Sequence, residues 1–445
     1  MKKCKLILVM AVCFSLTACN KFLDEKADRR QSVPDNLEDL ELMLDNAFDL
    51  NAGSGVVNSS TDEFYLRSDD VEGLPQIYRD PYTWAPQTEA IFDWQKFYKA
   101  IFIANTVLEQ LEKVDRASDP VRWDYCKGAA LYFRGYNLFQ LSQQYAPHYP
   151  GNENSPLGLP LRSSSDFNKV VTRSTLKETY DQMMLDIRAS MPLLPSKTYP
   201  PIRPSRWAAY AMLARLHLLL ENYTQAFDYA DSTLAVSDDL MDYNTIDPSP
   251  EFPIQRFNPE VIYHIMDDGA LTAGYTLVRI DSVLYRSFEE GDLRKKLFFI
   301  DNHDGSFSFR GNYTFSYYLF HGLATDEIYL IKAEAAVRTG KVDEALASLN
   351  TLLQHRWAPS KFQPVNIRDQ DALLVKILDE RKKEMIFRGQ RWSDLRRLNR
   401  DPRFQITLRR VINGQEYTLP PNDLRYTFLI PPQSINISGI PQNPR

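Results

Sequence analysis

The sequence predicts a mainly α fold, built from about four tetratricopeptide-like helical hairpins with long loop insertions and a few short β-hairpins. Apolar residues recur at helical spacing over long stretches, and two of these stretches share a spacing of small residues. Glycine is scarce, with 17 among 445 residues, and 44% of the residues are hydrophobic. This composition supplies a sizeable core and excludes disordered and collagen-like classes.

The first residues have the pattern of a lipoprotein signal peptide. Three lysines within the first five residues precede the apolar stretch 6–16, which is too short to span a bilayer. The sequence Leu-Thr-Ala-Cys then ends at Cys19. We expect cleavage after residue 18 and acylation of the Cys19 thiol by lipid of the membrane. An uncleaved anchor helix is the alternative.

Three regions follow from this assignment. Residues 1–18 form the signal peptide, residues 19–34 a polar lipidated tether, and residues 35–445 a single helical domain. Removal of three lysines with the signal leaves 49 basic against 58 acidic residues. An acidic exported chain is a poor match for DNA or RNA, so we expect no nucleic-acid partner.

The cysteine pattern predicts no internal disulfide. Two of the four cysteines leave with the signal peptide and Cys19 is acylated, so Cys126 has no partner in the mature chain. Cys126 lies in the apolar-periodic stretch 123–141, which favours a buried structural thiol over a nucleophile.

Two central helical hairpins are the clearest elements. Apolar spacing over 209–220 and 226–234 predicts the first, and spacing over 328–335 and 346–353, with Gly340 as a stop signal, predicts the second. Each hairpin carries two alanines twelve residues apart, Ala214 with Ala226 and Ala333 with Ala345. Small side chains at facing positions let two helices approach closely.

Two further pairs complete the scaffold. Helices over 89–114 and 123–145 form one, and the capping box from Thr175 to Glu178 opens another helix. The repeats are interrupted by insertions near 51–88, 146–171 and 237–322, which lack a helical pattern. Long ordered loops on a rigid scaffold commonly carry binding residues.

Near the C-terminus, residues 406–419 alternate between apolar and polar side chains around Asn413-Gly414, which predicts a β-hairpin.

A set of short motifs runs in order along the whole chain. They are CNKFLD at 19–24, ALYFR at 130–134, GLPL at 158–161, ARL at 214–216, EIYLIKAEA at 327–335, ERKKE at 380–384, RWSDLR at 391–396, LIPP at 429–432 and PQNP at 441–444. Together they resemble the SusD/RagB family of outer-membrane nutrient-binding lipoproteins.

The resemblance implies a helical lipoprotein with four tetratricopeptide-like units, seated as a lid on a SusC-like TonB-dependent β-barrel transporter. It implies capture of oligosaccharides or other nutrients on the extracellular side of the outer membrane, where Cys19 is the lipid anchor. Binding residues in the family often come from the corresponding early loop and from the region after the central repeats.

Charged residues near the C-terminus have a structural interpretation. Glu380, Glu384 and Arg388 are spaced for contact within a helix, and Arg381 falls on its apolar face. We expect a buried, hydrogen-bonded charge cluster here instead of a ligand site. The basic run 381–403 is interpreted as facing a partner or as paired internally.

The first aromatic candidate site lies over 307–317, where aromatic and polar residues alternate. A hairpin turning at Gly311-Asn312 would place the aromatics on one face. That face either packs on the helical core or offers Tyr313 or Tyr317 to a sugar ring, whose C–H groups suit a π face.

The second candidate site lies in the early insertion. Its residues combine flat rings with planar polar groups, which suit carbohydrate hydroxyls; they are Asp69, Asp70, Tyr78, Arg79, Tyr82 and Trp84, with Asn58 upstream. The alternative is a loop that is pinned by its own aromatic side chains.

Enzyme motifs are weak. The sequence contains no nucleophile elbow, zinc-protease motif or phosphate loop, and its six histidines never pair at metal-ligand spacing, so we expect no enzyme, no metal and no cofactor. A glycoside hydrolase needs only two suitably spaced carboxylates and therefore remains an alternative. Others are a repeat adaptor that binds only the transporter and a family member that binds peptides.

Overall fold

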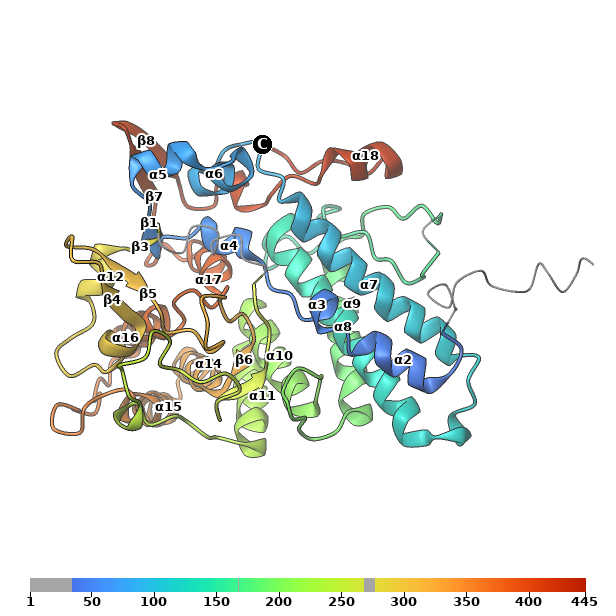
Figure 1. The fold of residues 1–445 in the computed structure, drawn as a ribbon, viewed down its shortest axis with the longest axis horizontal. Helices are drawn as coiled ribbons and strands as arrows, with labels where there is room; N and C mark the ends of the chain where they lie inside the picture. The colour runs from blue at the N-terminus through green and yellow to red at the C-terminus, as the bar shows by residue number, and fades with distance from the viewer. Residues whose placement is uncertain (1–33, 167, 268–276) are drawn as a thin grey trace, which may run out of the picture.

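The computed structural model describes residues 34–166, 168–267 and 277–445. The predicted signal peptide, Cys19 and most of the tether lie outside these residues. Figure 1 shows helices packed side by side through most of the molecule, with most of the labelled strands on one side and β6 among the central helices. The fold is mainly α, as predicted.

The scaffold is a series of helices in which chain neighbours pack against each other. The longer helices are α7 (Ile91–Leu111), α8 (Pro120–Tyr145), α9 (Leu176–Ser190), α10 (Arg206–Leu219), α11 (Tyr223–Val236), α14 (Thr325–Arg338), α15 (Val342–Gln354) and α16 (Gln370–Glu384). Helices α2 (Leu37–Leu44) and α3 (Ala47–Leu50) cover α7, while α17 (Arg391–Leu398) and α18 (Pro432–Ser438) follow α16. The predicted pairs of helices are confirmed.

Local sequence signals set several helix ends. The Thr175 side chain accepts from the N–H of Glu178, whose carboxylate accepts from the Thr175 N–H, so the predicted capping box is present. Gly340 has φ +79° and separates α14 from α15, a conformation that glycine adopts without strain. All four alanines of the two predicted central hairpins are fully buried, as close helix approach requires.

The early and central insertions contain short helices that the sequence did not indicate. These are α4 (Gly55–Ser59), α5 (Ser68–Gly73) and α6 (Gln76–Thr83) in the first, and α12 (Ser282–Arg286) and α13 (Arg294–Phe298) in the other. They have five to eight residues. So short a helix shows too few turns for apolar periodicity to be recognised.

The strands form small antiparallel pairs within the described residues. They are β1 (Phe64–Tyr65) with β3 (Arg279–Ile280), β2 (Val261–Tyr263) with β6 (Leu323–Ala324), β4 (Phe299–Asp301) with β5 (Phe307–Phe309), and β7 (Leu408–Ile412) with β8 (Gln415–Leu419). In the last pair, Asn413 and Gly414 both have positive φ, which confirms the predicted hairpin and its turn.

The hairpin predicted at Gly311-Asn312 is wrong. Strand β5 pairs with β4, so the turn lies at 302–306. A Cβ at Gly311 would lie 2.4 Å from the Phe298 ring, so this glycine is a close-packing position and not a hairpin turn. Beyond it the chain runs through turns and bends over 313–318 instead of a second strand, and the Tyr313 side chain is buried.

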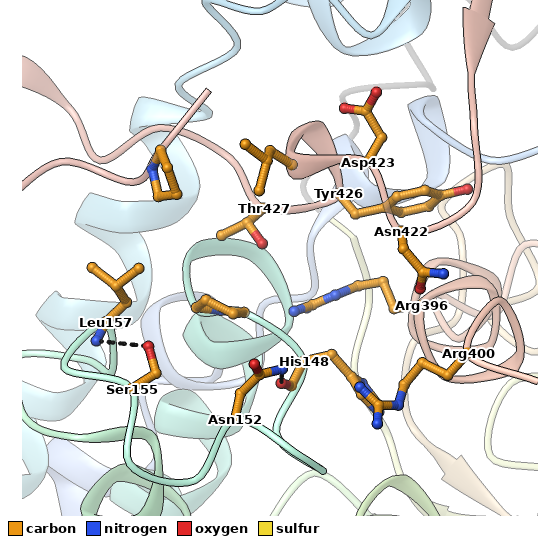
Figure 2. A pocket seen from close by; sticks show the side chains of 13 residues that line it. His148, Asn152, Ser155, Leu157, Arg396, Arg400, Asn422, Asp423, Tyr426 and Thr427 are labelled. Atoms are coloured by element: carbon orange, nitrogen blue, oxygen red, sulfur yellow. Dashed lines mark hydrogen bonds between the residues drawn. The ribbon is translucent and has the colours of Figure 1, made fainter.

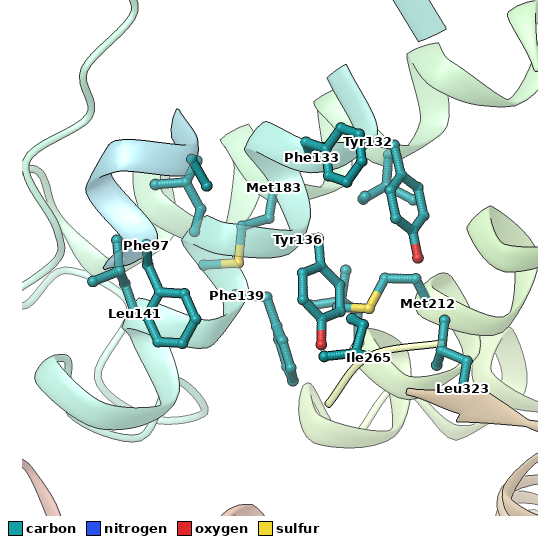
Figure 3. Packing of buried hydrophobic residues seen from close by; sticks show 14 of the residues in the cluster. Phe97, Tyr132, Phe133, Tyr136, Phe139, Leu141, Met183, Met212, Ile265 and Leu323 are labelled. Atoms are coloured by element: carbon teal, nitrogen blue, oxygen red, sulfur yellow. The ribbon is translucent and has the colours of Figure 1, made fainter. Parts of the chain in front are cut away.

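The largest apolar core lies among α7 to α10 and reaches β2 and β6. Figure 3 shows its aromatic and sulfur-containing side chains packed together, among them Phe97, Tyr132, Tyr136, Met183 and Met212. Cys126 belongs to the same core, and burial raises the pKa of its thiol to about 12. Its predicted role as a buried structural thiol is therefore confirmed.

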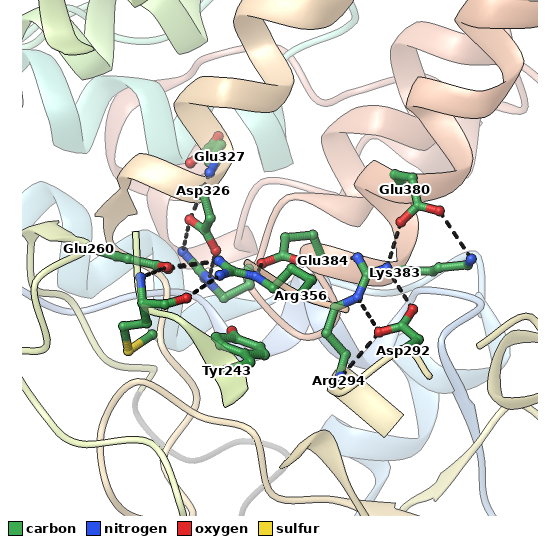
Figure 4. Close-up of polar contacts among 12 residues, drawn as sticks. Tyr243, Glu260, Asp292, Arg294, Asp326, Glu327, Arg356, Glu380, Lys383 and Glu384 are labelled. Carbon is green, nitrogen blue, oxygen red and sulfur yellow. Dashed lines mark hydrogen bonds and ion pairs between the residues drawn. The ribbon is translucent and has the colours of Figure 1, made fainter. Parts of the chain in front are cut away.

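A buried ion-pair network, drawn in Figure 4, fixes the C-terminal packing. Arg294 is fully buried and its guanidinium pairs with Asp292 at 2.7 Å, Glu380 at 2.6 Å and Glu384 at 3.0 Å. Arg356 connects Glu384 to Glu260. The predicted buried charge cluster is confirmed, and it reaches α13 and Glu260, the residue before β2. The contact within one helix expected for Arg388 is wrong, because α16 ends at Glu384 and Arg388 lies beyond it.

The basic run 381–403 is also largely paired inside the protein. Arg388 pairs with Asp326 at 2.9 Å, and the two guanidinium groups of Arg381 and Arg397 share Asp394 at 2.8 Å each. Arg397 also pairs with Glu334 of α14. The internal interpretation of this run is confirmed for these residues.

Two acidic residues attach the early insertion to the C-terminal segment. Asp62 pairs with Lys382 at 2.8 Å and with Arg391 at 2.7 Å. The neighbouring Glu63 carboxylate is buried and accepts from the N–H of Phe387 at 3.1 Å. Burial, with the charge of Asp62 as a further cause, raises the pKa of Glu63 to about 7.

Arg294→Met is expected to lower the free energy of unfolding by roughly 3–5 kcal/mol, because it leaves buried carboxylates without their cation. The matched control is Arg368→Met, whose pair with Asp343 is exposed and contributes about 0–1 kcal/mol. Urea unfolding of both variants measures the difference. Equal losses would contradict a central role for the Arg294 network.

Glu63→Gln is expected to gain stability relative to the wild type as the pH rises from about 5 to about 8. Because the pKa of Glu63 is raised in the folded state, its protonated form favours folding, and that contribution is lost as the pH rises through the folded pKa. Glutamine cannot ionise and still offers an oxygen to Phe387. The expected gain is at most of the order of 3 kcal/mol, at about 1.4 kcal/mol per pKa unit.

Thermal unfolding across this pH range measures the effect. The exposed Glu290→Gln variant is the control and should follow the wild type at every pH. A Glu63→Gln curve parallel to the wild type would show that Glu63 does not titrate in this range.

Candidate functional site

Two aromatic residues of the early insertion are packed around a buried arginine. Arg410 of β7 lies over the Tyr82 ring at 3.6 Å and over the Trp84 ring at 4.6 Å from the centroids. Its guanidinium donates to the carbonyls of Ser59, Thr61 and Tyr82. Both rings are buried, so they hold the loop in place by packing inside the protein.

Their polar atoms are also occupied. The Tyr82 hydroxyl accepts from the N–H of Leu66 at 2.8 Å, and the Trp84 indole N–H donates to the Ser60 carbonyl at 2.9 Å. Asn58 is buried beside the His321 ring, 2.7 Å from its Nε2. These three residues therefore lie inside the protein, where contacts with the loop backbone, Arg410 and His321 account for them.

The other early candidates lie nearer the surface. Asp69 and Asp70 are in the first turn of α5, and Tyr78 and Arg79 are on α6; Asp69 and Arg79 are exposed, and Asp70 and Tyr78 are partly buried. Contact of Asp69, Tyr78 and Arg79 with a ligand stays a prediction.

A hollow of about 370 Å³ borders α6 and is lined by residues that the sequence did not single out. Asp80 accepts from the amides of Gln76 at 3.1 Å and Gln87 at 3.2 Å, and Glu89 lies at its edge. Such planar groups suit sugar hydroxyls. The density of amides and carboxylates over 76–89 is the signal that could have identified them.

Tyr313 is at the centre of a buried polar group. Its hydroxyl donates to Glu260 and, at 3.1 Å, to Asp326, while the Arg388 guanidinium lies 4.5 Å from its ring centre. Burial, with the charge of Asp326 as a further cause, raises the pKa of Glu260 to about 7. The structure thus gives Tyr313 a role in core packing.

Tyr317, in contrast, is exposed on the segment between β5 and β6. Its ring centre lies 4.6 Å from that of Tyr318, with an interplanar angle of 33°. The exposed fractions are 42% for Tyr317, 36% for Tyr318 and 47% for Phe315. We name these three residues the tyrosine platform. Sequence reasoning missed Tyr318 because it breaks the alternation on which the prediction depended, and it did not single out Phe315, which follows that alternation.

Backbone-directed hydrogen bonds hold the segment of the tyrosine platform. The Thr314 hydroxyl donates to the Tyr318 carbonyl at 2.6 Å, and the Asn312 amide donates to the Ser316 carbonyl at 3.3 Å. The N–H of Asp267 donates to the Leu319 carbonyl at 2.9 Å. The platform is therefore an ordered, exposed aromatic surface, the kind of surface on which a sugar ring can stack.

The predicted site residues divide between two surfaces. Tyr78 and Arg79 lie on α6, which packs against α4, and Figure 1 shows α6 close to the C-terminus. Tyr317 belongs to the tyrosine platform, whose backbone neighbours are Asp267 and Leu319. The sequence alone did not show that these candidate residues belong to different surfaces.

The described residues show neither a metal-binding cluster nor a membrane-spanning helix. In this part of the chain, no group of three or more His, Cys, Asp or Glu residues is arranged to hold a metal ion. No helix among residues 34–445, outside the undescribed positions, is long and apolar enough to cross a membrane.

Solved structures with the same fold cover nearly the whole chain. A SusD superfamily protein of Bacteroides thetaiotaomicron is 22% identical, covers 92% of this chain and 100% of its own, and has a TM-score of 0.76. A putative sugar binding protein of Bacteroides vulgatus is 20% identical over 93% of this chain and 99% of its own, with a TM-score of 0.76. A laminarin binding SusD-like protein is 17% identical over 92% and 100% of the two chains, with a TM-score of 0.69.

Sequence comparisons give the family. SusD-like protein P38 of Formosa agariphila is 32% identical over 148 residues, which are 32% of this chain and 28% of that protein, so the match spans less than a third of its length. A family model described as starch-binding, associating with outer membrane, matches residues 21–218, and the SusD family model matches residues 325–427. The matches cover both halves of the chain, which belongs to the SusD/RagB family.

Proposed function

We propose that the protein is a nutrient-binding lipoprotein of the cell surface, with an oligosaccharide as its ligand. The observation that carries the proposal is the tyrosine platform, an exposed pair of adjacent rings on an ordered segment. The family model described as starch-binding and the laminarin binding structural relative support a glycan as the ligand class.

The chemistry of the tyrosine platform fits a sugar. The axial C–H groups of a pyranose ring are weakly positive and contact the negative face of an aromatic ring. Phenol hydroxyls can in addition exchange hydrogen bonds with sugar hydroxyls. Because the rings are already ordered, little conformational entropy is lost when a ligand binds.

The proposed partner is a SusC-like TonB-dependent β-barrel transporter, on which the protein acts as lid and capture subunit. The proposed anchor is the acylated Cys19 in the outer membrane, with the domain facing the extracellular side. Each buried acyl methylene contributes about 0.8 kcal/mol, so several acyl chains hold a protein at a membrane without a spanning helix.

The alternatives make different predictions. A surface glycoside hydrolase would release reducing ends from a glycan panel. An adaptor that binds only the transporter would ignore every glycan and peptide but would still co-purify with the β-barrel, and a peptide-binding member would bind on a peptide array.

Tyr317→Ala and Tyr318→Ala are each expected to weaken binding of starch-derived or laminarin-derived oligosaccharides about tenfold, which corresponds to about 1.4 kcal/mol. Isothermal titration calorimetry measures the affinity. The melting temperature should stay nearly unchanged because both rings are exposed.

Two controls accompany this experiment. Tyr317→Phe keeps the ring face and should retain most of the affinity, and Phe48→Ala removes an exposed aromatic side chain of α3, away from the tyrosine platform. Wild-type affinity in both platform variants would remove the tyrosine platform as the glycan site.

Cys19→Ser is expected to release the protein from the membrane fraction and to abolish incorporation of labelled palmitate, because serine carries no thiol to acylate. The control is Cys126→Ser, which changes a buried thiol of the core and should leave membrane attachment intact. Fractionation and mass spectrometry measure both outcomes. Labelled, membrane-bound Cys19→Ser protein would contradict the anchor.

A further inference from the structure

A cavity of about 410 Å³ lies between the segment that follows α8, helix α17 and the C-terminal segment. Its volume falls in the range of about 300–1,000 Å³ that is usual for small-molecule sites. Figure 2 shows side chains from these three segments converging on it. The polar lining includes His148, Asn152, Ser155, Arg396, Arg400 and Asn422. The tyrosine platform contributes none of its lining residues.

Arg396 brings a buried positive charge to this cavity. Only 5% of the residue is exposed, and its guanidinium donates to the carbonyls of Ser142, Gln143 and Ala146 at the end of α8. Burial lowers its pKa to about 10. Other buried arginines, such as Arg294 and those at positions 356 and 397, pair with carboxylates.

Among the described residues, no carboxylate lies within ion-pair distance of Arg396. The carbonyl groups at the end of a helix carry only partial negative charge. A guanidinium that has lost much of its hydration and faces a cavity therefore favours an anion there.

Arg400 adds a second cationic group to the cavity. Its side chain is 36% exposed, and its closest carboxylate oxygen belongs to Glu221, 3.8 Å away. Gly151 has φ +83°, and a Cβ there would lie 3.1 Å from the Arg400 guanidinium, so this glycine leaves room for it.

The negative charges that border the cavity have cations beside them, and for Glu221 that cation is Arg400. The Asp423 carboxylate, which also lines the cavity, is bound by Arg425 at 2.8 Å. Burial lowers the pKa of His148 to about 4, so this ring is neutral at pH 7. Its Nε2 is buried without a hydrogen-bond partner in the described structure and lies 3.7 Å from Glu221.

Two amide side chains are positioned for neutral hydrogen bonds. Asn152 donates to the His148 carbonyl at 2.9 Å, and Asn422 donates to the Asn399 carbonyl at 2.9 Å. Each of these bonds uses the amide nitrogen and leaves the amide oxygen available as an acceptor for hydroxyl groups. The cavity thus combines a cationic part with hydroxyl-binding groups.

We propose that this cavity binds a sugar ring that carries a negatively charged group, either a carboxylate or a sulfate ester. The anion lies against Arg396 and Arg400, and the ring hydroxyls contact Asn152, Ser155 and Asn422. The proposal rests on the glycan-binding function proposed above and gives it a second site with a preference for acidic sugars.

Calorimetry with three probes tests the proposal on the full domain: digalacturonate, its neutral methyl ester and a sulfated disaccharide. The wild type is expected to bind at least one acidic probe about tenfold more tightly than the ester, and the preferred acidic probe identifies the anion. Arg400→Gln is expected to lower that affinity about tenfold. Arg368→Gln, on the exposed pair with Asp343, is the matched control and should bind like the wild type.

Asn152→Trp provides a second variant that keeps both arginines and fills the mouth of the cavity, because Asn152 is exposed at its edge. It is expected to abolish binding of the acidic probe while leaving the melting temperature unchanged. Binding of neither acidic probe, equal affinity for acid and ester, or wild-type binding by both Arg400→Gln and Asn152→Trp would overturn the proposal.

The Tyr317→Ala/Tyr318→Ala double variant separates this proposal from the function of the tyrosine platform. It is expected to lose neutral glycans and to keep the acidic probe. If the acidic probe is lost in this double variant but kept in Arg400→Gln, the cavity proposal fails and the glycan-binding function stands.

Discussion

Arg356 joins three parts of the chain that are far apart in sequence. Its guanidinium pairs with Glu384 at the end of α16 and with Glu260 before β2, and it donates to the carbonyl of Met241 after α11. All of these side-chain charges are buried, and Arg294 extends the same network to α13. A buried charge without its partner is strongly unfavourable, so alternative packings of the long central insertion are disfavoured.

These ion pairs fix the buried side of the central insertion, so its exposed side can carry an ordered aromatic platform. Tyr313 belongs to the network through Glu260 and Asp326, while Tyr317, four residues later, is exposed. One short segment thus contains both an interior ring and a surface ring. The buried ion-pair network therefore helps to fix where the tyrosine platform lies.

Buried arginines act in two ways in this protein. Arg294, Arg356 and Arg397 pair with carboxylates, and these pairs connect helices to the insertions. Arg396 and Arg410 instead donate to backbone carbonyls. Arg410 is covered by aromatic rings, whereas Arg396 faces a cavity. Arg396 and Arg410 thus carry buried positive charge without a paired carboxylate. Of these two arginines, Arg396 is the one that a ligand in the cavity could reach.

Local sequence determined the longer helices of the scaffold, the capping box at Thr175 and the hairpin at Asn413-Gly414, because these features depend on residues within a few turns of each other. It also predicted a buried charge cluster at Glu380 and Glu384, since these residues are one helical turn apart and Arg381 falls on the apolar face of the same helix. The family resemblance came from motifs distributed along the whole chain.

Only the tertiary structure decided which aromatic side chains are inside. Tyr82 and Trp84 are buried because Arg410, more than 300 positions away, lies against their rings, whereas Tyr317 is 42% exposed. The cavity at Arg396 likewise needs three separate segments. Contacts between distant positions leave no periodic pattern in a single sequence. Spacing could therefore identify candidate residues but could not predict which of them are buried and which are exposed.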